Sequence, residues 1–175
     1  MAELDAAGQA LELLVFEIGG RTLGLPSSHV VEIVRAVAVT PLPRAPAIVE
    51  GVINVRGAIV PVIDIRARLG SPARPLAMSD HFVLARTGGR KVALHVNQVI
   101  HLISLDRAQV EPAERVGWGA EHLAGVGVLP DGLVVILDLE EFLTADEARG
   151  LNDEFAAAAP SENAPSPSDA VPERA

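Results

Sequence analysis

The sequence contains an internal repeat, which limits the folds that it can adopt. Residues 14–25 (LVFEIGGRTLGL) align without gaps with residues 83–94 (VLARTGGRKVAL), at an offset of 69 (83 minus 14). Residues 51–69 align with residues 125–143 at an offset of 74 (125 minus 51). Two copies of one supersecondary unit predict two similar small subdomains, because a solenoid needs more copies than two.

Each copy consists of short apolar runs separated by turn signals. In the first copy, hairpins are expected around Gly19-Gly20 and around Arg56-Gly57, with a further strand over residues 30–35 between them. The second copy repeats this plan around Gly88-Gly89 and around residues 130–132. Strands of four to six residues in two sets of about five predict a mostly β protein. We expect two five-stranded antiparallel barrels packed together across a shared apolar seam.

Short helices are expected where a side chain can cap them. Asp64 and Asp138 occupy the same place in the two copies, and each is placed to cap a short helix, the first over residues 65–69. Thr144 and Glu147 form a capping box that opens a C-terminal helix. The expected domains are a flexible N-terminus (1–12), a first barrel (13–77), a second barrel (78–145), the C-terminal helix (146–159) and a disordered Pro-, Ser- and Ala-rich tail (160–175).

Composition excludes several classes of function. The chain carries a formal net charge of -9 and only 3% aromatic residues, so it lacks both the positive charge and the stacking side chains of a nucleic-acid-binding protein. It has no cysteine, which excludes disulfides and thiol chemistry and fits a reducing compartment. A basic, apolar leader and a long apolar run are both lacking, so a cytoplasmic protein without membrane insertion is expected.

No catalytic or metal-binding motif emerges from the polar residues. The five histidines show no metal-ligand spacing, and capping explains Asp64 and Asp138 better than acid–base chemistry does. We therefore expect no enzyme activity, no metal and no cofactor. Two alternatives stay open: a small barrel enzyme that uses His29 or His95 with Asp64, and a self-assembling scaffold. The scaffold is suggested by opposite charges on the two halves, +3 over residues 13–77 and -4 over residues 78–145.

Glu32 and Arg56 are charges placed among apolar residues. Glu32 lies within the run Val-Val-Glu-Ile-Val, and Arg56 lies at the tight turn between two apolar strands. If both are flanked by buried residues, a partly buried ion pair between them is favoured, because an unpaired buried charge costs several kcal/mol. The alternative is that strand alternation turns each side chain separately to solvent.

The string over residues 51–66, GVINVRGAIVPVIDIR, together with Val30-x-Glu32-Ile33, resembles the CheW family of chemotaxis coupling proteins. The resemblance covers roughly residues 12–145. It implies barrels of the SH3-like kind and an adaptor without catalytic activity. Such adaptors bind the regulatory domain of the histidine kinase CheA and the cytoplasmic tip of chemoreceptors, and the same domain also serves other kinase-linked pathways.

The resemblance also implies which residues bind these partners. The receptor- and kinase-coupling surface would comprise Val30, Glu32, Ile33, Asn54, Arg56 and Gly57. Further kinase contacts would use apolar barrel ends of the second unit, with Leu102, Ile103 and Leu105 as candidates. Asn97 departs from the family pattern, which commonly has an acidic residue at this position.

Overall fold

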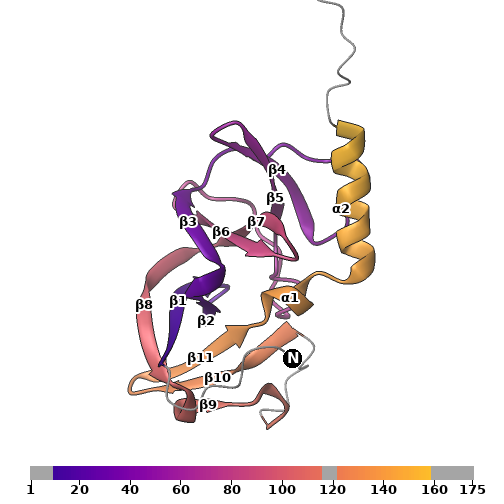
Figure 1. Ribbon diagram of the computed structural model, residues 1–175. Helices are drawn as coiled ribbons and strands as arrows, with labels where there is room; N and C mark the ends of the chain where they lie inside the picture. Colours follow the sequence, from indigo (N-terminus) through magenta and orange to yellow (C-terminus); the bar gives the residue numbers. More distant parts are fainter. Residues whose placement is uncertain (1–9, 116–121, 159–175) are drawn as a thin grey trace, which may run out of the picture.

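The computed structural model describes residues 10–115 and 122–158, and these residues form eleven strands and a few short helices (Figure 1). The expected flexible N-terminus up to residue 9, residues 116–121 and the residues after 158, including the expected tail, lie outside the described residues. The elements in chain order are β1 (Ala10–Ile18), β2 (Arg21–Pro26), the 3-10 helix η1 (Ser27–His29), β3 (Val30–Arg35), β4 (Val49–Val55), β5 (Ala58–Ile63), β6 (His81–Thr87), β7 (Arg90–Val96), β8 (Gln98–Asp106), η2 (Arg107–Gln109), β9 (Val110–Glu111), η3 (Ala113–Arg115), β10 (Leu123–Leu129), β11 (Gly132–Leu137), α1 (Leu139–Phe142) and α2 (Ala145–Ala158).

The strands form two sheets, each of which takes strands from both halves of the chain. One sheet has six strands in the order β8-β1-β2-β11-β10-β9, and the other has five in the order β3-β6-β7-β5-β4. The mostly β prediction is confirmed, but the division at residue 77 is wrong for the sheets, because the first hairpins of the two copies change places. The exchange also brings β2 beside β11 and β5 beside β7 as parallel neighbours, whereas only antiparallel pairs were expected.

Three apolar clusters hold the sheets together. The largest draws residues from both sheets, from α1 and from α2, and it is the seam expected from the repeat. A smaller cluster lies within each sheet. Strand alternation explains this layering: in β6, Phe82 and Leu84 join the cluster of the five-stranded sheet, while Val83 and Ala85 face the shared seam. Strands with two buried faces account for the nearly continuous apolar runs of the sequence.

Two equivalent glycines lie where another segment crosses the last hairpin of each copy. Gly51 lies at a bulge in β4 where Thr40 pairs with Val52, with backbone N–O distances of 2.8 and 2.9 Å. Gly125 lies at the matching bulge in β10, where Glu111 pairs with Val126. At both positions a Cβ atom would approach the carbonyl oxygen of the crossing segment, at 2.2 Å for Gly51 and 2.8 Å for Gly125. These crossings therefore require glycine.

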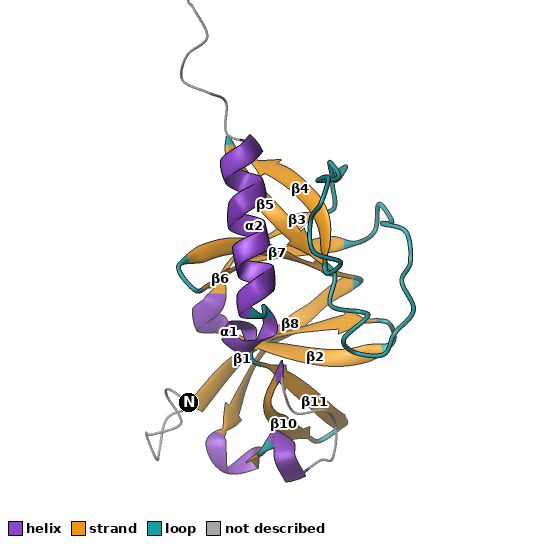
Figure 2. Ribbon diagram, turned by 90° about the vertical axis from the view of Figure 1, so that its right-hand side faces the viewer, coloured by secondary structure: helices purple, strands orange, loops and turns teal. Residues whose placement is uncertain are grey.

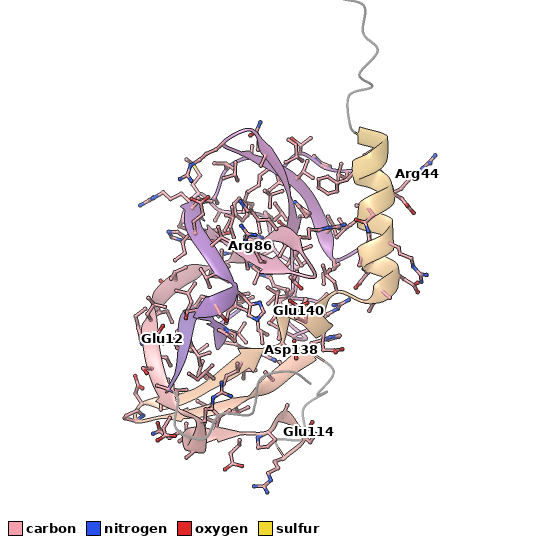
Figure 3. All side chains as sticks on the ribbon, in the orientation of Figure 1. Glu12, Arg44, Arg86, Glu114, Asp138 and Glu140 are labelled. Carbon is pink, nitrogen blue, oxygen red and sulfur yellow. The ribbon has the colours of Figure 1, made fainter. Side chains whose placement is uncertain are left out.

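The two equivalent aspartates have different structures. Asp138 caps α1 as expected, accepting hydrogen bonds from the backbone N–H groups of Glu140 and Glu141, and it lies between the two sheets (Figure 3). The predicted helix after Asp64 is wrong, because residues 66–70 form turns. The Asp64 carboxylate instead accepts hydrogen bonds from the backbone N–H of Arg66 and from its guanidinium, which is buried.

Helix α2 stands beside β4 and β5 in two perpendicular views (Figures 1 and 2). Its Leu151 is fully buried in the shared seam, and its Gly150 lies close to Pro46. None of the helices in the described ranges is long and apolar enough to cross a membrane.

The capping box of α2 provides a first test. Thr144 Oγ1 accepts a hydrogen bond from the Glu147 backbone N–H at 3.2 Å, and the Glu147 carboxylate accepts one from the Thr144 N–H at 2.9 Å. Thr144→Ala should therefore cost about 1 kcal/mol of unfolding free energy and lower the melting temperature by about 2–4 °C. Ser28→Ala is the control, because Ser28 is exposed and η1 has no side-chain cap. Equal melting temperatures for the two variants would contradict a capping role for Thr144.

Candidate interaction surface

Glu32 and Arg56 meet across the two edges of the five-stranded sheet. Glu32 lies on the edge strand β3, and Arg56 lies at the turn between β5 and the other edge strand, β4. Arg56 Nη2 is 2.9 Å from Glu32 Oε2, and its Nη1 donates to Oε1 at 3.3 Å. A two-point contact fixes the plane of the guanidinium as well as its position. The sheet therefore curves until its first and last strands are linked by an ion pair.

The expected pair is present, but it is more exposed than predicted. The Arg56 side chain is 80% exposed and that of Glu32 is 22% exposed. An exposed pair of this kind contributes at most about 1 kcal/mol to stability, because water screens both charges. The ion pair therefore fixes the shape and charge of the surface and contributes little to the stability of the fold.

The backbone of the β4–β5 turn is strained at Arg56. Arg56 and Gly57 have φ values of 52° and 87°, which is the pattern of a two-residue type I′ hairpin turn. The Asn54 side chain accepts a hydrogen bond from the Gly57 N–H at 2.8 Å and so holds the turn. An arginine with positive φ is uncommon, since Asn or Asp suits this position better. Local strain of this type is found preferentially at functional sites.

Exposed apolar side chains lie on the same elements as the ion pair, β3 and the β4–β5 hairpin. Ile33 is 41% exposed as the resemblance implies, whereas Val30 is half-buried and packs against the shared seam. Val31 (39% exposed) and Ile59 (52% exposed) belong to the same region of β3 and β5, and the sequence did not single them out. Two sequence relations could have indicated that they are exposed. Val31 lies two residues before Ile33 and so shares its face of β3, and Ile59 pairs directly with Asn54 in the β4–β5 hairpin.

The second half has an apolar surface without the ion pair. Leu102, the repeat counterpart of Ile33, is 66% exposed, and Leu133, the counterpart of Ile59, is 60% exposed. Ile100 and Val128 are exposed as well. His101 stands where Glu32 stands in the first copy, so the charge pattern differs between the two surfaces.

The three kinase-contact candidates from the sequence differ in how far they are exposed. Leu102 is exposed, Ile103 is half-buried, and Leu105 is only 3% exposed, in the core of the six-stranded sheet. The choice of Leu105 as a contact residue was therefore wrong. Residues 102 and 105 are three apart, and an odd spacing places them on opposite faces of β8.

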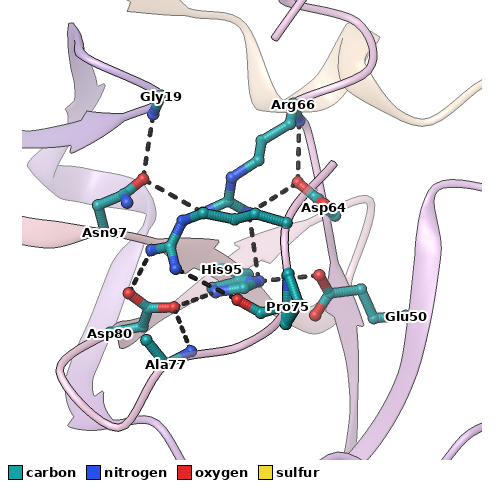
Figure 4. Close-up of polar contacts among 10 residues, drawn as sticks. Gly19, Glu50, Asp64, Arg66, Pro75, Ala77, Asp80, His95 and Asn97 are labelled. Atoms are coloured by element: carbon teal, nitrogen blue, oxygen red, sulfur yellow. Dashed lines mark hydrogen bonds and ion pairs between the residues drawn. The ribbon is translucent and has the colours of Figure 1, made fainter. Parts of the chain in front are cut away.

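A cluster of charged side chains joins β4 and β7 to the segments after β5 and before β6, and the sequence analysis did not predict it as a whole (Figure 4). His95 of β7 is fully buried, with Nδ1 2.8 Å from Glu50 Oε1 and Nε2 2.8 Å from Asp80 Oδ2. The Arg66 guanidinium, 1% exposed, is bonded to Asp64 at 3.0 Å and to Asn97 at 3.2 Å. Arg74 pairs with Asp80. Three carboxylates thus face two guanidinium groups and one histidine.

Asn97 links this cluster to the first hairpin. Its Oδ1 accepts hydrogen bonds from both Arg66 and the Gly19 backbone N–H, the latter at 3.0 Å. A carboxylate at this position would add a fourth negative charge to the cluster, whereas the neutral amide of Asn97 adds none. The one signal for the cluster in the sequence was a single histidine within the apolar run 92–96.

The pKa values of the cluster reflect these contacts. Burial alone would lower the pKa of His95, but hydrogen bonds to Glu50 and Asp80 outweigh it and raise the pKa above its ordinary value of 6.5. Burial would raise the pKa of Asp80, yet its bonds to His95, the Ala77 N–H and Arg74 lower it. Asp80 therefore stays charged, and the charged form of His95 is favoured more than in a free histidine.

Glu50, Asp64 and His95 place their donor atoms within 4.8 Å of one another, a spacing that a metal ion could also use. Arg66 Nη1 already lies among them, 3.0 Å from Asp64 and 3.3 Å from His95 Nδ1, and it supplies the positive charge. The set is therefore an ion-pair cluster. The same contacts argue against an enzyme site using His95 with Asp64, because a fully buried imidazole with a carboxylate on each nitrogen cannot reach a substrate.

Comparison with known proteins agrees with the sequence resemblance. The model of the CheW-like domain family matches residues 12–147. A chemotaxis protein CheW from Klebsiella aerogenes is 30% identical over 145 residues, covering 82% of this chain and 86% of the relative. Protein FrzA from Myxococcus xanthus is 33% identical over 116 residues, covering 66% of this chain and 72% of its own length.

Solved structures give the same answer for the fold. The scaffolding protein TtCheW from Thermoanaerobacter tengcongensis superimposes with a TM-score of 0.72 at 28% identity, covering 79% of this chain and 95% of that one. The family-model match over residues 12–147 includes both copies of the repeat and the β4–β5 hairpin. The chain therefore belongs to the CheW-like domain family.

Proposed function

We propose that this protein is a non-catalytic adaptor that couples chemoreceptors to a histidine kinase of the CheA type. The observation that carries the proposal is the Glu32–Arg56 pair at the surface, with exposed Val31, Ile33 and Ile59 on the strands that position it. Exposed apolar side chains together with an oriented charge pair are typical of a protein–protein contact. Membership of a family that includes chemotaxis and scaffolding proteins supports the same function.

The two halves offer two different surfaces for two partners. The first, defined as Val30, Glu32, Ile33, Asn54, Arg56 and Gly57, is proposed for coupling to the cytoplasmic tip of the receptor and to the kinase. The second, defined as Ile100, Leu102, Val128 and Leu133, lacks an ion pair and suits an apolar contact with the kinase regulatory domain. Self-assembly through the oppositely charged halves, and service in another kinase-linked pathway, remain alternatives within the same class of adaptor.

Leu102→Glu tests the second surface. A charge at the centre of an apolar contact must be desolvated, so we expect the affinity for the purified CheA regulatory domain to fall at least about tenfold, since a hot-spot side chain carries about 2 kcal/mol. The melting temperature should not change, because Leu102 is 66% exposed. Isothermal titration calorimetry with both proteins in solution measures this affinity.

The matched control is Met78→Glu, which places the same charge on a side chain that is 92% exposed and lies in the β5–β6 connection. This variant should bind the regulatory domain like the parent protein. Equal losses for the two variants would indicate a general charge effect, and no loss for Leu102→Glu would rule out the second surface as the kinase contact.

A further inference from the structure

We propose that His95 is a proton-operated switch in the fold: with both nitrogens protonated it ties Glu50 of β4 into the buried cluster, and after losing one proton it accepts a hydrogen bond from Arg66 and releases Glu50. This inference concerns the fold itself and does not depend on the proposed function.

The protonated state follows from the distances. Glu50 Oε1 and Asp80 Oδ2 each lie 2.8 Å from one nitrogen of the same imidazole. A neutral imidazole has a single N–H and can donate to only one of them, which would leave a lone pair facing the other carboxylate. Only the imidazolium donates to both, so the two short distances fit the charged form of His95.

The neutral state has a donor already in place. Arg66 Nη1 lies 3.3 Å from His95 Nδ1, the nitrogen that faces Glu50. While Nδ1 carries a proton, this approach brings two donors together; once the proton leaves, Nδ1 becomes an acceptor for the guanidinium. Asp80 keeps its own bond from Nε2 in both states, and it is also held by Arg74 and by the Ala77 N–H. The neutral tautomer is therefore fixed with its proton on Nε2.

Glu50 is the group that can leave. Its side chain is 23% exposed, whereas that of Asp80 is 1% exposed. Among the described residues, the structure gives Glu50 no hydrogen-bond partner other than His95. A released Glu50 carboxylate can therefore turn to water, so neither state leaves a buried charge without a partner.

The charged groups around His95 set the direction of the switch. Glu50 comes from β4, Asp64 and Arg66 follow β5, and Arg74 and Asp80 precede β6. The uncharged neighbours are Asn97 after β7 and the Phe82 ring of β6, which lies edge-on at 5.8 Å. With His95 protonated, three positive and three negative groups balance; without that proton, one negative charge is in excess and Glu50 carries it outward.

The residue that the switch releases, Glu50, lies in β4 next to its bulge. Glu50 directly precedes Gly51, where β4 bulges and Thr40 crosses it. The same strand leads to the turn that carries Arg56. Because the raised pKa of His95 lies above 6.5, the bond to Glu50 stabilises the fold fully below pH 6.5 and is lost as pH rises through the pKa of the folded state.

Nitrogen-detected NMR of the imidazole side chains in the full chain tests this proposal. We expect His95 to titrate with a midpoint above 6.5, with both nitrogens protonated below it and the proton on Nε2 above it. A midpoint at or below 6.5, or a neutral form with its proton on Nδ1, would overturn the proposal. This measurement uses the unmodified protein and so does not depend on any variant folding.

Glu50→Gln supplies the second arm. The amide no longer attracts the imidazolium and can donate to a neutral Nδ1, so the midpoint of His95 should fall by about one pH unit. The variant should be less stable than the parent below the parent midpoint, and the difference should vanish or reverse above it. His101 is the internal control, because it is exposed and, within the described part of the chain, makes no contact with the cluster, so its NMR signals should be the same in both proteins.

Glu114→Gln is the control for removing a carboxylate, since Glu114 is exposed on η3. It should change neither the His95 midpoint nor the dependence of stability on pH. A cost of Glu50→Gln that is the same at every pH would contradict release of Glu50 and refute the switch.

Discussion

Gly51→Ala should lower the free energy of unfolding by about 3–5 kcal/mol, which is a large fraction of the stability of an ordinary domain. The added Cβ would lie 2.2 Å from the Thr40 carbonyl oxygen and 2.8 Å from the Val39 side chain. The backbone atom cannot move aside, because Thr40 is held to Val52 by two hydrogen bonds. The φ of Gly51, 150°, adds backbone strain for any L residue.

Gly20→Ala separates the clash from the strain. Gly20 also has a positive φ, 76°, but a Cβ there meets nothing within 4 Å. Its cost should be about 1–2 kcal/mol, from backbone strain alone. Gly125→Ala should resemble Gly51→Ala, because Glu111 crosses β10 in the same manner. Urea unfolding of the three variants decides the matter, and equal costs at positions 20 and 51 would show that the crossing tolerates a side chain.

Arg56→Asn should abolish coupling while leaving the fold as stable as before or slightly more stable. Asparagine adopts positive φ readily and is favoured before glycine in a type I′ turn, so the strain at φ 52° is relieved. The lost ion pair is 80% exposed on the arginine side, so its contribution to stability is at most about 1 kcal/mol. Affinity for receptor and kinase should nevertheless fall by at least about thirtyfold, as expected for a truncated hot-spot arginine.

Arg44→Asn is the matched control. Arg44 is the other non-glycine residue with positive φ in the described ranges, at 61°, and it lies in the β3–β4 connection. Its replacement should relieve similar strain without affecting either partner. Parallel melting curves and pull-downs check both variants, and a large drop in melting temperature for Arg56→Asn would show that the ion pair holds the fold.

The sequence predicted the strands well but not how they pair. Glycine pairs and apolar runs place the hairpins correctly, since both signals are local. The exchange of β1–β2 with β6–β7 depends on which hairpin packs beside which, and the two hairpins have nearly the same pattern of apolar residues. Local patterning cannot distinguish two alternatives that bury the same faces.

The surface ion pair could be predicted from the sequence, whereas the buried cluster could not. Glu32 and Arg56 could be paired from sequence because each is a lone charge in an apolar setting. In the buried cluster, His95 is 45 residues from Glu50 and 15 residues from Asp80 along the chain. Each of these side chains, considered alone, could equally face solvent. Asp64 was interpreted through its equivalence to Asp138, but its carboxylate binds both the backbone N–H and the guanidinium of Arg66, and residues 66–70 form turns.

A double-mutant cycle on Glu32 and Arg56 tests the central claim most directly. The quantity measured is the amount of this protein and of the CheA-type kinase that co-sediments with membranes containing the chemoreceptor. If the pair acts as one unit, Glu32→Ala and Arg56→Asn should each cause a similar loss, and the double variant should be little worse than either. Losses that add fully in the double variant, or co-sedimentation that none of the variants changes, would contradict the account.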